Sequence, residues 1–200
     1  MILLMIRHGE SEADLLHVHE GRADFELTRR GHRQAEAMAE YVNDRWRISR
    51  IYASPLKRAA QTARHLSQKV GREIRFEEDL MEFNNGLLAG LSFEEADRRY
   101  PVVRDLPPDR AVYGQESKVE FRARADRVLK KICAQSGEDE IVAVVTHGGM
   151  IQQLYGALMQ QPVPSPFVIC TGDTGIHVWK LDRGAVYLLN ANLTAHTAGI

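Results

Sequence analysis

Ile2-Leu3-Leu4-Met5-Ile6, followed by Arg7-His8-Gly9-Glu10, is the stretch of sequence that decides the fold. Five consecutive apolar residues next to a charged motif predict a short buried strand. Open α/β sheets place their functional groups beyond the carboxyl ends of their strands, and a glycine there lets a ligand approach the backbone. The triplet Arg7-His8-Gly9 alone more often marks an ordinary strand end, so the rest of the chain must decide whether His8 is functional.

A second predicted strand ends in the same way. Ile141 to Val145 is a continuous run of β-branched and apolar residues, and Thr146-His147-Gly148-Gly149 follows it. Such a run is typical of a central strand that is covered on both faces. Because parallel strands share one carboxyl edge, we expect His8 and His147 to converge there.

A third predicted strand leads into a helix that carries an arginine. Arg50 to Ala53 has the pattern of a short strand, and Ser54-Pro55 predicts the N-cap and first position of a helix that continues to residue 70. Arg58 would lie in the first turn, where the helix dipole adds positive potential. An arginine on a helix is more often solvated, and only this position favours a functional role.

The alternation of strand and helix patterns predicts a three-layer α/β/α sandwich, with a mostly parallel central sheet and helices on both faces. We expect residues 1–200 to form a single domain with a cap-like excursion around residues 78–116. The other expected elements are a helix over 29–46 with Thr28 as N-cap, a strand over 73–76, capping-box helices that begin after Ser92 and Ser117 and end near Tyr100 and Gly137, a helix over 150–159, and a hairpin of 175–181 with 185–189.

Composition narrows the class of protein. The chain has 26 Lys and Arg against 27 Asp and Glu, a net charge of -1, which argues against a nucleic-acid or membrane-surface partner. Cys133 and Cys170 lie far apart in sequence and suggest neither a disulfide scaffold nor a metal site. No segment is apolar over the ~18 residues that a membrane span needs, so we expect a cytoplasmic protein.

The predicted sheet edge would gather positive charge. Arg7 and Arg58, together with His8 and His147, would surround one small volume. Such a cluster repels itself unless an anion occupies it, and phosphate suits the planar, bidentate guanidinium group. The two arginines also disfavour the imidazolium form of His8 and so keep a lone pair available.

With these residues in place, the chain resembles the histidine phosphatase superfamily, also called the phosphoglycerate mutase-like family. The resemblance extends over nearly the whole chain, in five blocks that occur in the family order. The blocks are Arg7-His8-Gly9-Glu10-Ser11, Asp24-Phe25-Glu26-Leu27-Thr28 with Gly31 and Gln34-Ala35, Ser54-Pro55-Leu56-Lys57-Arg58-Ala59-Ala60-Gln61-Thr62-Ala63, Glu82 with Gly86 and Gly90, and Thr146-His147-Gly148.

The resemblance implies a phosphohistidine mechanism without metal or cofactor. His8 would attack phosphorus, and water would then hydrolyse the phosphoenzyme. Arg7, Arg58 and a protonated His147 would hold the phosphoryl oxygens, and Glu82 would be general acid and then base. The expected substrate-binding residues are Arg7, Arg58, His147, Ser11, Asp14, Glu20, Gly21, Thr146 and Gly148.

Some of these assignments have alternatives. Glu82 stands in an acidic segment, and only its spacing to the following glycines, as in the family, selects it. Thr146 would either bind the phosphate or simply end its strand. His17-Val18-His19-Glu20 could suggest a zinc site, but no third ligand has a suitable spacing, so this segment is better interpreted as part of the pocket wall.

The chain also departs from the family pattern. Asp14 replaces a common asparagine, Glu20 replaces a common glutamine, and Leu87-Leu88-Ala89 stands where a tryptophan is common. A carboxylate that faced the phosphate would repel it. Asp14 and Glu20 therefore either turn away or meet a cationic part of the substrate, and we hypothesise a substrate with an amino group or hydroxyls near its phosphate.

Three functions are compatible with these residues. The leading one is a phosphatase that acts on a small phosphorylated metabolite. A phosphoglycerate mutase would use the same residues but return the phosphoryl group to the substrate, and such mutases tend to be longer. A non-catalytic phospholigand-binding protein is the third, although the complete residue set argues against it. The final hairpin could offer a pairing edge for a homodimer.

Overall fold

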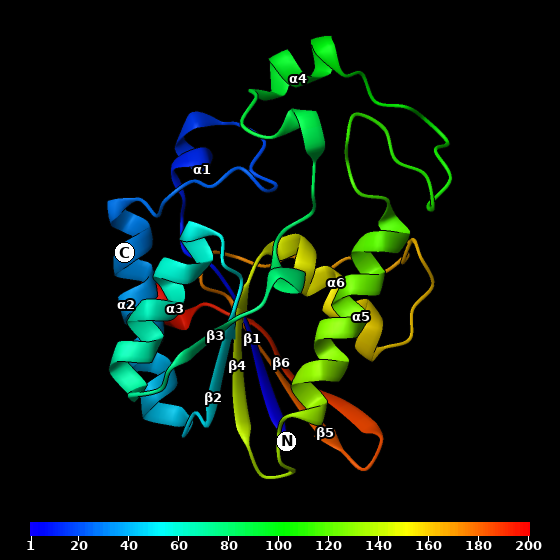
Figure 1. Cartoon of the computed structure of the whole chain (residues 1–200). Coiled ribbons are helices and arrows are strands. Elements are labelled where there is room, and N and C mark those ends of the chain that lie inside the picture. The colour runs from blue at the N-terminus through cyan, green and yellow to red at the C-terminus, as the bar shows by residue number, and fades with distance from the viewer.

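A computed structural model describes residues 1–200. Its centre is a six-stranded sheet with the strand order β3-β2-β4-β1-β5-β6 (Figure 1). Four strands are parallel, and β5 and β6 form an antiparallel hairpin that pairs with β1. The mostly parallel sheet is therefore confirmed. The strands are β1 (Ile2–Arg7), β2 (Arg50–Ala53), β3 (Ile74–Phe76), β4 (Ile141–Thr146), β5 (Ile176–Asp182) and β6 (Ala185–Leu193).

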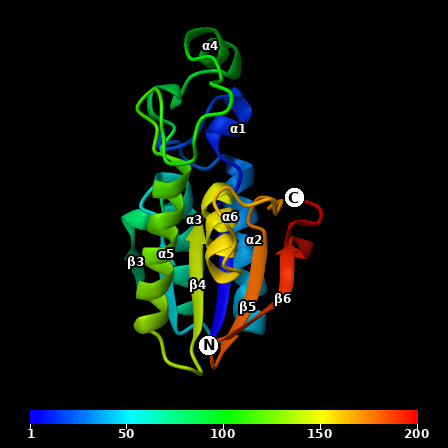
Figure 2. The ribbon, with the colours of Figure 1, turned by 90° about the vertical axis from the view of Figure 1, so that its right-hand side faces the viewer.

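Helices cover both faces of this sheet (Figure 2). Alternate residues of β1 point to opposite faces, as the two-residue period of a strand requires. Leu3 and Met5 pack with α5 and α6, whereas Leu4 and Ile6 pack with α2 and α3. The helices are α1 (Glu12–Leu16), α2 (Arg29–Arg45), α3 (Lys57–Val70), α4 (Phe93–Arg99), α5 (Lys118–Ala134) and α6 (Gly148–Leu158), with 3-10 turns η1 (Glu78–Leu80), η2 (Gly86–Leu88) and η3 (Ala195–Thr197).

Most helix boundaries agree with the sequence signals. The Thr28 hydroxyl accepts a hydrogen bond from the Gly31 amide, and Ser117 with Glu120 forms a capping box. The helix expected to end near residue 137 ends at Ala134. The short helix α1 was not predicted, because its five residues have no apolar periodicity.

The predicted N-cap of α3 is wrong. The helix begins at Lys57, and Leu56 occupies the N-cap position. Ser54 instead lies buried at the sheet edge, where its hydroxyl accepts from the Leu56 amide at 3.3 Å and contacts His147 at 2.8 Å. A long-range partner therefore replaces the local capping role that the sequence suggested.

Residues 78–116 leave the sheet and rise, with α1, above its carboxyl edge (Figures 1 and 2). Residues 18 and 19, which follow α1, contact residues 91–93 of this excursion. Val18 and Ser92 form an isolated bridge, the His19 amide donates to the Leu91 carbonyl at 2.9 Å, and the His19 ring packs edge-on against Phe93 at 4.7 Å. None of the helices has the length and apolar character that a membrane crossing requires.

His177 is a buried polar residue in β5. Its Nδ1 accepts from the Tyr155 hydroxyl at 2.6 Å and from the Asn192 amide at 3.3 Å, so Nε2 carries the proton and donates to the Thr171 hydroxyl at 3.0 Å. Burial lowers the pKa of His177 to about 4. The folded protein therefore holds this imidazole neutral in mildly acidic solution.

We expect the free energy of unfolding to fall as the pH decreases from about 6.5 to about 4. Unfolded His177 takes up a proton near its ordinary pKa, whereas the folded side chain stays neutral, so acid favours the unfolded state by up to about 1.4 kcal/mol per pH unit. His177→Gln should flatten this dependence in urea unfolding. His17→Asn, a change on the exposed surface, is the control and should keep the wild-type slope. Equal slopes for wild type and His177→Gln would contradict the prediction.

Candidate active site

Two histidines meet at the carboxyl edge of the sheet because β1 and β4 are adjacent and parallel. Arg7 lies opposite Thr146 in their register, so the next residues, His8 and His147, emerge side by side. Their ring centroids are 5.1 Å apart, and both side chains are buried. The convergence expected from the two strand patterns is what the structure shows.

His8 has one ring nitrogen fixed as a donor. Its Nδ1 lies 2.8 Å from the Gly9 carbonyl, which can only accept, so Nδ1 carries the proton and Nε2 carries the lone pair. The Arg58 Nε–H donates to this Nε2 at 3.3 Å. Burial, followed by the charges of Arg58 and Arg7, lowers the pKa of His8 well below its ordinary value. His8 is therefore a neutral imidazole with its lone pair facing a cation.

Arg58 is fully buried in the first turn of α3. Its Nη1 donates to the Ala23 carbonyl at 3.0 Å, and its Nη2 donates to the Gly21 carbonyl at 2.8 Å. Gly21 has a φ of +47°, and a Cβ there would overlap the Asn85 side chain, so the carbonyl position depends on glycine. Gly21, expected at the substrate, therefore holds Arg58 through its backbone.

Thr62 connects the backbone beside His8 to the backbone of Arg58, and the sequence patterns did not single it out. Its hydroxyl accepts from the Gly9 amide at 3.1 Å and donates to the Arg58 carbonyl at 2.8 Å. Its spacing of four residues from Arg58 places both on one face of α3, which is a signal that could have found it.

Arg7 is anchored by a loop that no sequence pattern indicated. Its Nη1 donates to the Thr171 carbonyl at 2.8 Å and lies 3.4 Å from Asp173 Oδ1. A Cβ on Gly148 would lie 4.0 Å from the Arg7 side chain, so this glycine borders the same space. Arg7 is thus held by the loop that contains Thr171 and Asp173, whereas Arg58 is held by the loop that contains Gly21 and Ala23.

His147 is held through one nitrogen only. Its Nε2 lies 2.8 Å from the Ser54 hydroxyl, and its buried Nδ1 has no hydrogen-bond partner in the protein. Burial, Arg58 and His8 together lower the pKa of His147 well below its ordinary value. The surroundings thus favour a neutral His147, and the protonated form expected from the family chemistry would need an anion beside it.

Glu82 reaches the site beside the N-terminus of α6. Its Oε2 accepts from the Gly149 amide at 2.9 Å, and its Oε1 accepts from the Phe83 amide at 2.7 Å. Arg124 donates to the Glu82 carbonyl at 2.8 Å and fixes the backbone. A Cβ on Gly149 would overlap the Glu82 carboxylate, so a larger residue here would displace that carboxylate from its present position.

The side chain of Thr146, expected either to bind phosphate or to end its strand, contacts the backbone of η1. Its buried hydroxyl donates to the Leu80 carbonyl at 2.7 Å, which ties the end of β4 to η1. This contact favours the strand-end alternative, and a role of Thr146 in phosphate binding stays a prediction.

Asp14 and Glu20, the two departures from the family pattern, have different positions. Asp14 is exposed and accepts from the Ser11 amide at 2.8 Å within the capping box of α1. Ser11 itself is buried, and its hydroxyl bonds to Glu20. Glu20 faces the site, with Oε2 3.7 Å from His8 Nε2 and Oε1 3.5 Å from Arg58 Nε.

A sequence model of the histidine phosphatase superfamily (branch 1) matches residues 3–194. The chain belongs to this superfamily. The resemblance seen in the sequence blocks is thereby confirmed, and its extent corresponds to the whole sheet with all six strands.

Relatives and solved structures of the superfamily cover most of the chain. A glucosyl-3-phosphoglycerate phosphatase from Mycobacterium tuberculosis is 32% identical over 171 residues, which are 80% of this chain and 76% of the relative. Phosphoserine phosphatase 1 from Hydrogenobacter thermophilus is 26% identical over 97% of this chain and 93% of its own length. The native structure of a mycobacterial glucosyl-3-phosphoglycerate phosphatase aligns with a TM-score of 0.83 at 28% identity, covering 96% of this chain and 98% of that one.

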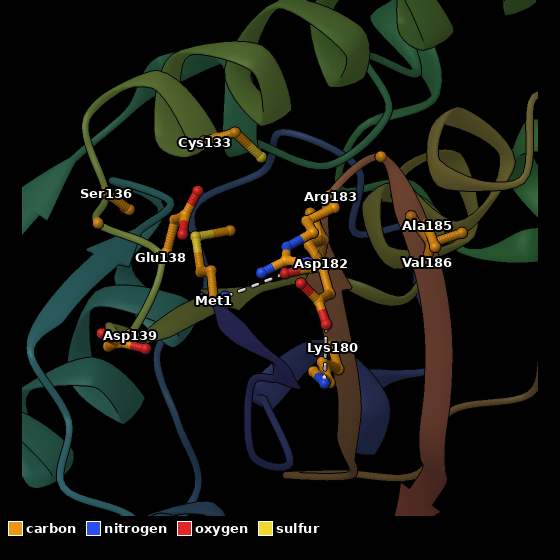
Figure 3. A pocket seen from close by; sticks show the side chains of 13 residues that line it. Met1, Cys133, Ser136, Glu138, Asp139, Lys180, Asp182, Arg183, Ala185 and Val186 are labelled. Atoms are coloured by element: carbon orange, nitrogen blue, oxygen red, sulfur yellow. Dashed lines mark hydrogen bonds and ion pairs between the residues drawn. The ribbon is translucent and has the colours of Figure 1, made fainter.

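A cavity of about 500 Å³ lies at the opposite, amino end of the sheet (Figure 3). Met1 and the turn of the β5–β6 hairpin line it, and Lys180 pairs with Asp182 there at 3.0 Å. The lining contains no histidine, and burial raises the pKa of its half-buried Cys133 thiol, which disfavours the reactive thiolate. The two histidines and two arginines expected from the sequence thus gather at the His8 edge and not at this cavity.

Arg58→Gln should weaken binding of inorganic phosphate about 10- to 100-fold, because a charge-assisted clamp is lost. It should also raise the pKa of His8, since Arg58 is one of the causes that lower it. Calorimetry measures the first effect, and NMR titration of the imidazole measures the second. Lys57→Gln removes the neighbouring exposed cation, which pairs with Glu26 at the surface, and should change neither. An unchanged phosphate affinity in Arg58→Gln would overturn the assignment.

Proposed function

We propose that the protein hydrolyses small phosphomonoesters through a phosphohistidine intermediate on His8. One observation carries this proposal: Nδ1 of a neutral, buried His8 is committed to the Gly9 carbonyl, so the lone pair of Nε2 faces the Arg58 guanidinium. A nucleophile for phosphoryl transfer needs such an unprotonated nitrogen next to fixed positive charge.

In the first step, Nε2 of His8 attacks phosphorus, and an N–P bond forms as the P–O bond to the alcohol breaks. Arg7 and Arg58 hold the equatorial oxygens, where charge is spread in the transition state. Glu82 donates a proton to the leaving oxygen. In the second step the Glu82 carboxylate accepts a proton from water, the water oxygen attacks phosphorus, and phosphate leaves as His8 returns to its neutral form.

His147 can serve this reaction without being protonated beforehand. The Ser54 hydroxyl can donate to Nε2, which leaves a proton on the unpartnered Nδ1. That N–H would then donate to a phosphoryl oxygen, and a dianion in contact with it would favour the imidazolium form. Ser54 would thus select the tautomer of His147.

The type of reaction, the substrate, the cap and the location of the protein belong to the same proposal. Phosphatases among the relatives support hydrolysis, while a "phosphoglycerate mutase-like protein 4" from Arabidopsis thaliana, 32% identical over 76% of this chain, keeps mutase chemistry as the second candidate. We propose that no metal or cofactor takes part, and that residues 78–116 act as a cap on a single domain. The proposed substrate is a small phosphorylated metabolite, and the proposed location is the cytoplasm. The final hairpin could offer a pairing edge for a homodimer.

His8→Ala should abolish turnover of phosphomonoesters and the incorporation of acid-labile phosphate, because no other lone pair is placed for attack. The readouts are steady-state hydrolysis of an aryl phosphate and trapping of 32P-labelled protein. Circular dichroism checks the fold, and His65→Gln, two helical turns beyond Arg58 and hydrogen-bonded to His32, is the control. Undiminished hydrolysis by His8→Ala would refute the nucleophile assignment.

The mutase alternative has its own assay. With 3-phosphoglycerate and a bisphosphoglycerate primer, a mutase would form 2-phosphoglycerate without releasing phosphate, whereas the proposed phosphatase releases inorganic phosphate. Isomerisation that exceeds phosphate release would favour the mutase.

Gly149→Ala should lower kcat/KM for alkyl phosphates about 10- to 100-fold, because the new Cβ displaces the Glu82 carboxylate. Hydrolysis of p-nitrophenyl phosphate should fall less, because its leaving group needs less help from an acid. Gly137→Ala, whose Cβ makes only an ordinary 3.6 Å contact with Glu140, is the control. An equal loss for both leaving groups would contradict a role of this glycine through Glu82.

A further inference from the structure

The carboxyl group of Glu20 lies beside the position that a reacting phosphate would take. Its Oε2 is 3.7 Å from His8 Nε2, and its Oε1 is 3.5 Å from Arg58 Nε. These nitrogens are the nucleophile and the clamp of the proposed function, on which this inference rests. A phosphate oxygen held between them would touch Glu20.

A charged Glu20 would oppose that phosphate. Like charges in contact repel, and the effect is strong where water is partly excluded. A neutral carboxyl group instead offers an O–H donor, much as the glutamine common in the family offers an N–H. The charged and titratable groups that face Glu20 are Arg7 and His8 at the end of β1, Asp14 with the Ser11 hydroxyl on α1, and Arg58 on α3.

A count of protons around Ser11 points in the same direction. The Ser11 hydroxyl contacts both Asp14 Oδ2, at 3.2 Å, and Glu20 Oε1. It carries a single proton and can donate to one carboxylate at a time, which leaves a lone pair facing the other. One additional proton on Glu20 removes one of the two negative charges that converge on this hydroxyl.

Burial decides which carboxyl group takes that proton. Asp14 is exposed to solvent and also accepts from the Ser11 amide. The Glu20 side chain is only 19% exposed, and burial, reinforced by the Asp14 charge, raises the pKa of Glu20 against the opposing effects of Arg58 and Ser11. The Glu20 carboxyl group is therefore the site that gains a proton most readily.

We propose that Glu20 takes up one proton from solvent when a phosphate group binds, and donates it in a hydrogen bond to the phosphate oxygen beside His8 Nε2. Before binding, the group lacks this additional proton, and the Ser11 hydroxyl donates to one carboxylate at a time. With phosphate present, the proton taken up by Glu20 points to the phosphate, and Ser11 donates to Oε1. Phosphate affinity then falls with rising pH, by up to 10-fold per pH unit above the pKa of Glu20.

The test compares wild type with Glu20→Gln, which has nearly the same shape and donates without a proton from solvent. Calorimetry of inorganic phosphate binding in buffers of different ionisation enthalpy gives the number of protons taken up. We expect the wild type to take up about one more proton than Glu20→Gln at pH 7 or above, and to bind more weakly there. The ratio of the two affinities cancels the titration of inorganic phosphate itself, which is the same for both proteins.

Controls separate the alternatives. Glu12→Gln, an exposed carboxyl on the same helix α1, should take up as many protons as the wild type. Equal proton uptake by wild type and Glu20→Gln overturns the proposal, as does a loss of uptake in Asp14→Asn alone. A charged Glu20 that binds an amino group of the substrate would give the same equal uptake, together with a preference for amine-bearing phosphates that Glu20→Gln loses.

The proposed function can fail independently of this inference. If the wild type binds phosphate with the extra proton but hydrolyses no phosphomonoester, only the proposed function is overturned. If neither protein binds phosphate, the inference and the site assignment are both overturned.

Discussion

The buried guanidinium group of Arg58 is the feature on which the rest of the active site depends. A cation removed from water must be satisfied by nearby acceptors, and unpaired burial is costly. Here the acceptors are the carbonyls of Gly21 and Ala23 and the lone pair of His8, while the nearest carboxylate oxygen lies at 3.5 Å. Neutral acceptors hold the arginine in place but leave much of its charge available for a phosphate.

This arrangement couples three segments that are distant in sequence. The Gly21 and Ala23 carbonyls come from the loop after α1, His8 comes from the end of β1, and Arg58 opens α3. Thr62 closes the connection, because one hydroxyl bonds to the backbone on either side of the His8–Arg58 contact. Each segment is positioned by the others, so the orientation of the His8 ring follows from the position of the buried arginine.

The sequence predicted the parts of the site that depend on repeating patterns. Apolar runs locate β1 and β4, and the parallel register then brings His8 and His147 together. Side chains with distant partners were outside the reach of such patterns. Ser54 looks like an N-cap but bonds to His147, and the Thr146 hydroxyl bonds to Leu80. Short polar side chains have several partners of similar strength, and only the tertiary structure selects one.

Asp14 and Glu20 show why the chemical effect of a residue exchange depends on its surroundings. Both replace an amide by a carboxyl group, yet the capping box of α1 turns Asp14 to solvent, while Glu20 lies against His8. Burial disfavours charge on either kind of group, so the same water-poor space lowers the pKa of His8 and raises that of Glu20. The condition that keeps His8 neutral therefore also eases the proton uptake that we propose for Glu20, and an acidic residue that gains a proton can lie beside a phosphate clamp without cancelling it.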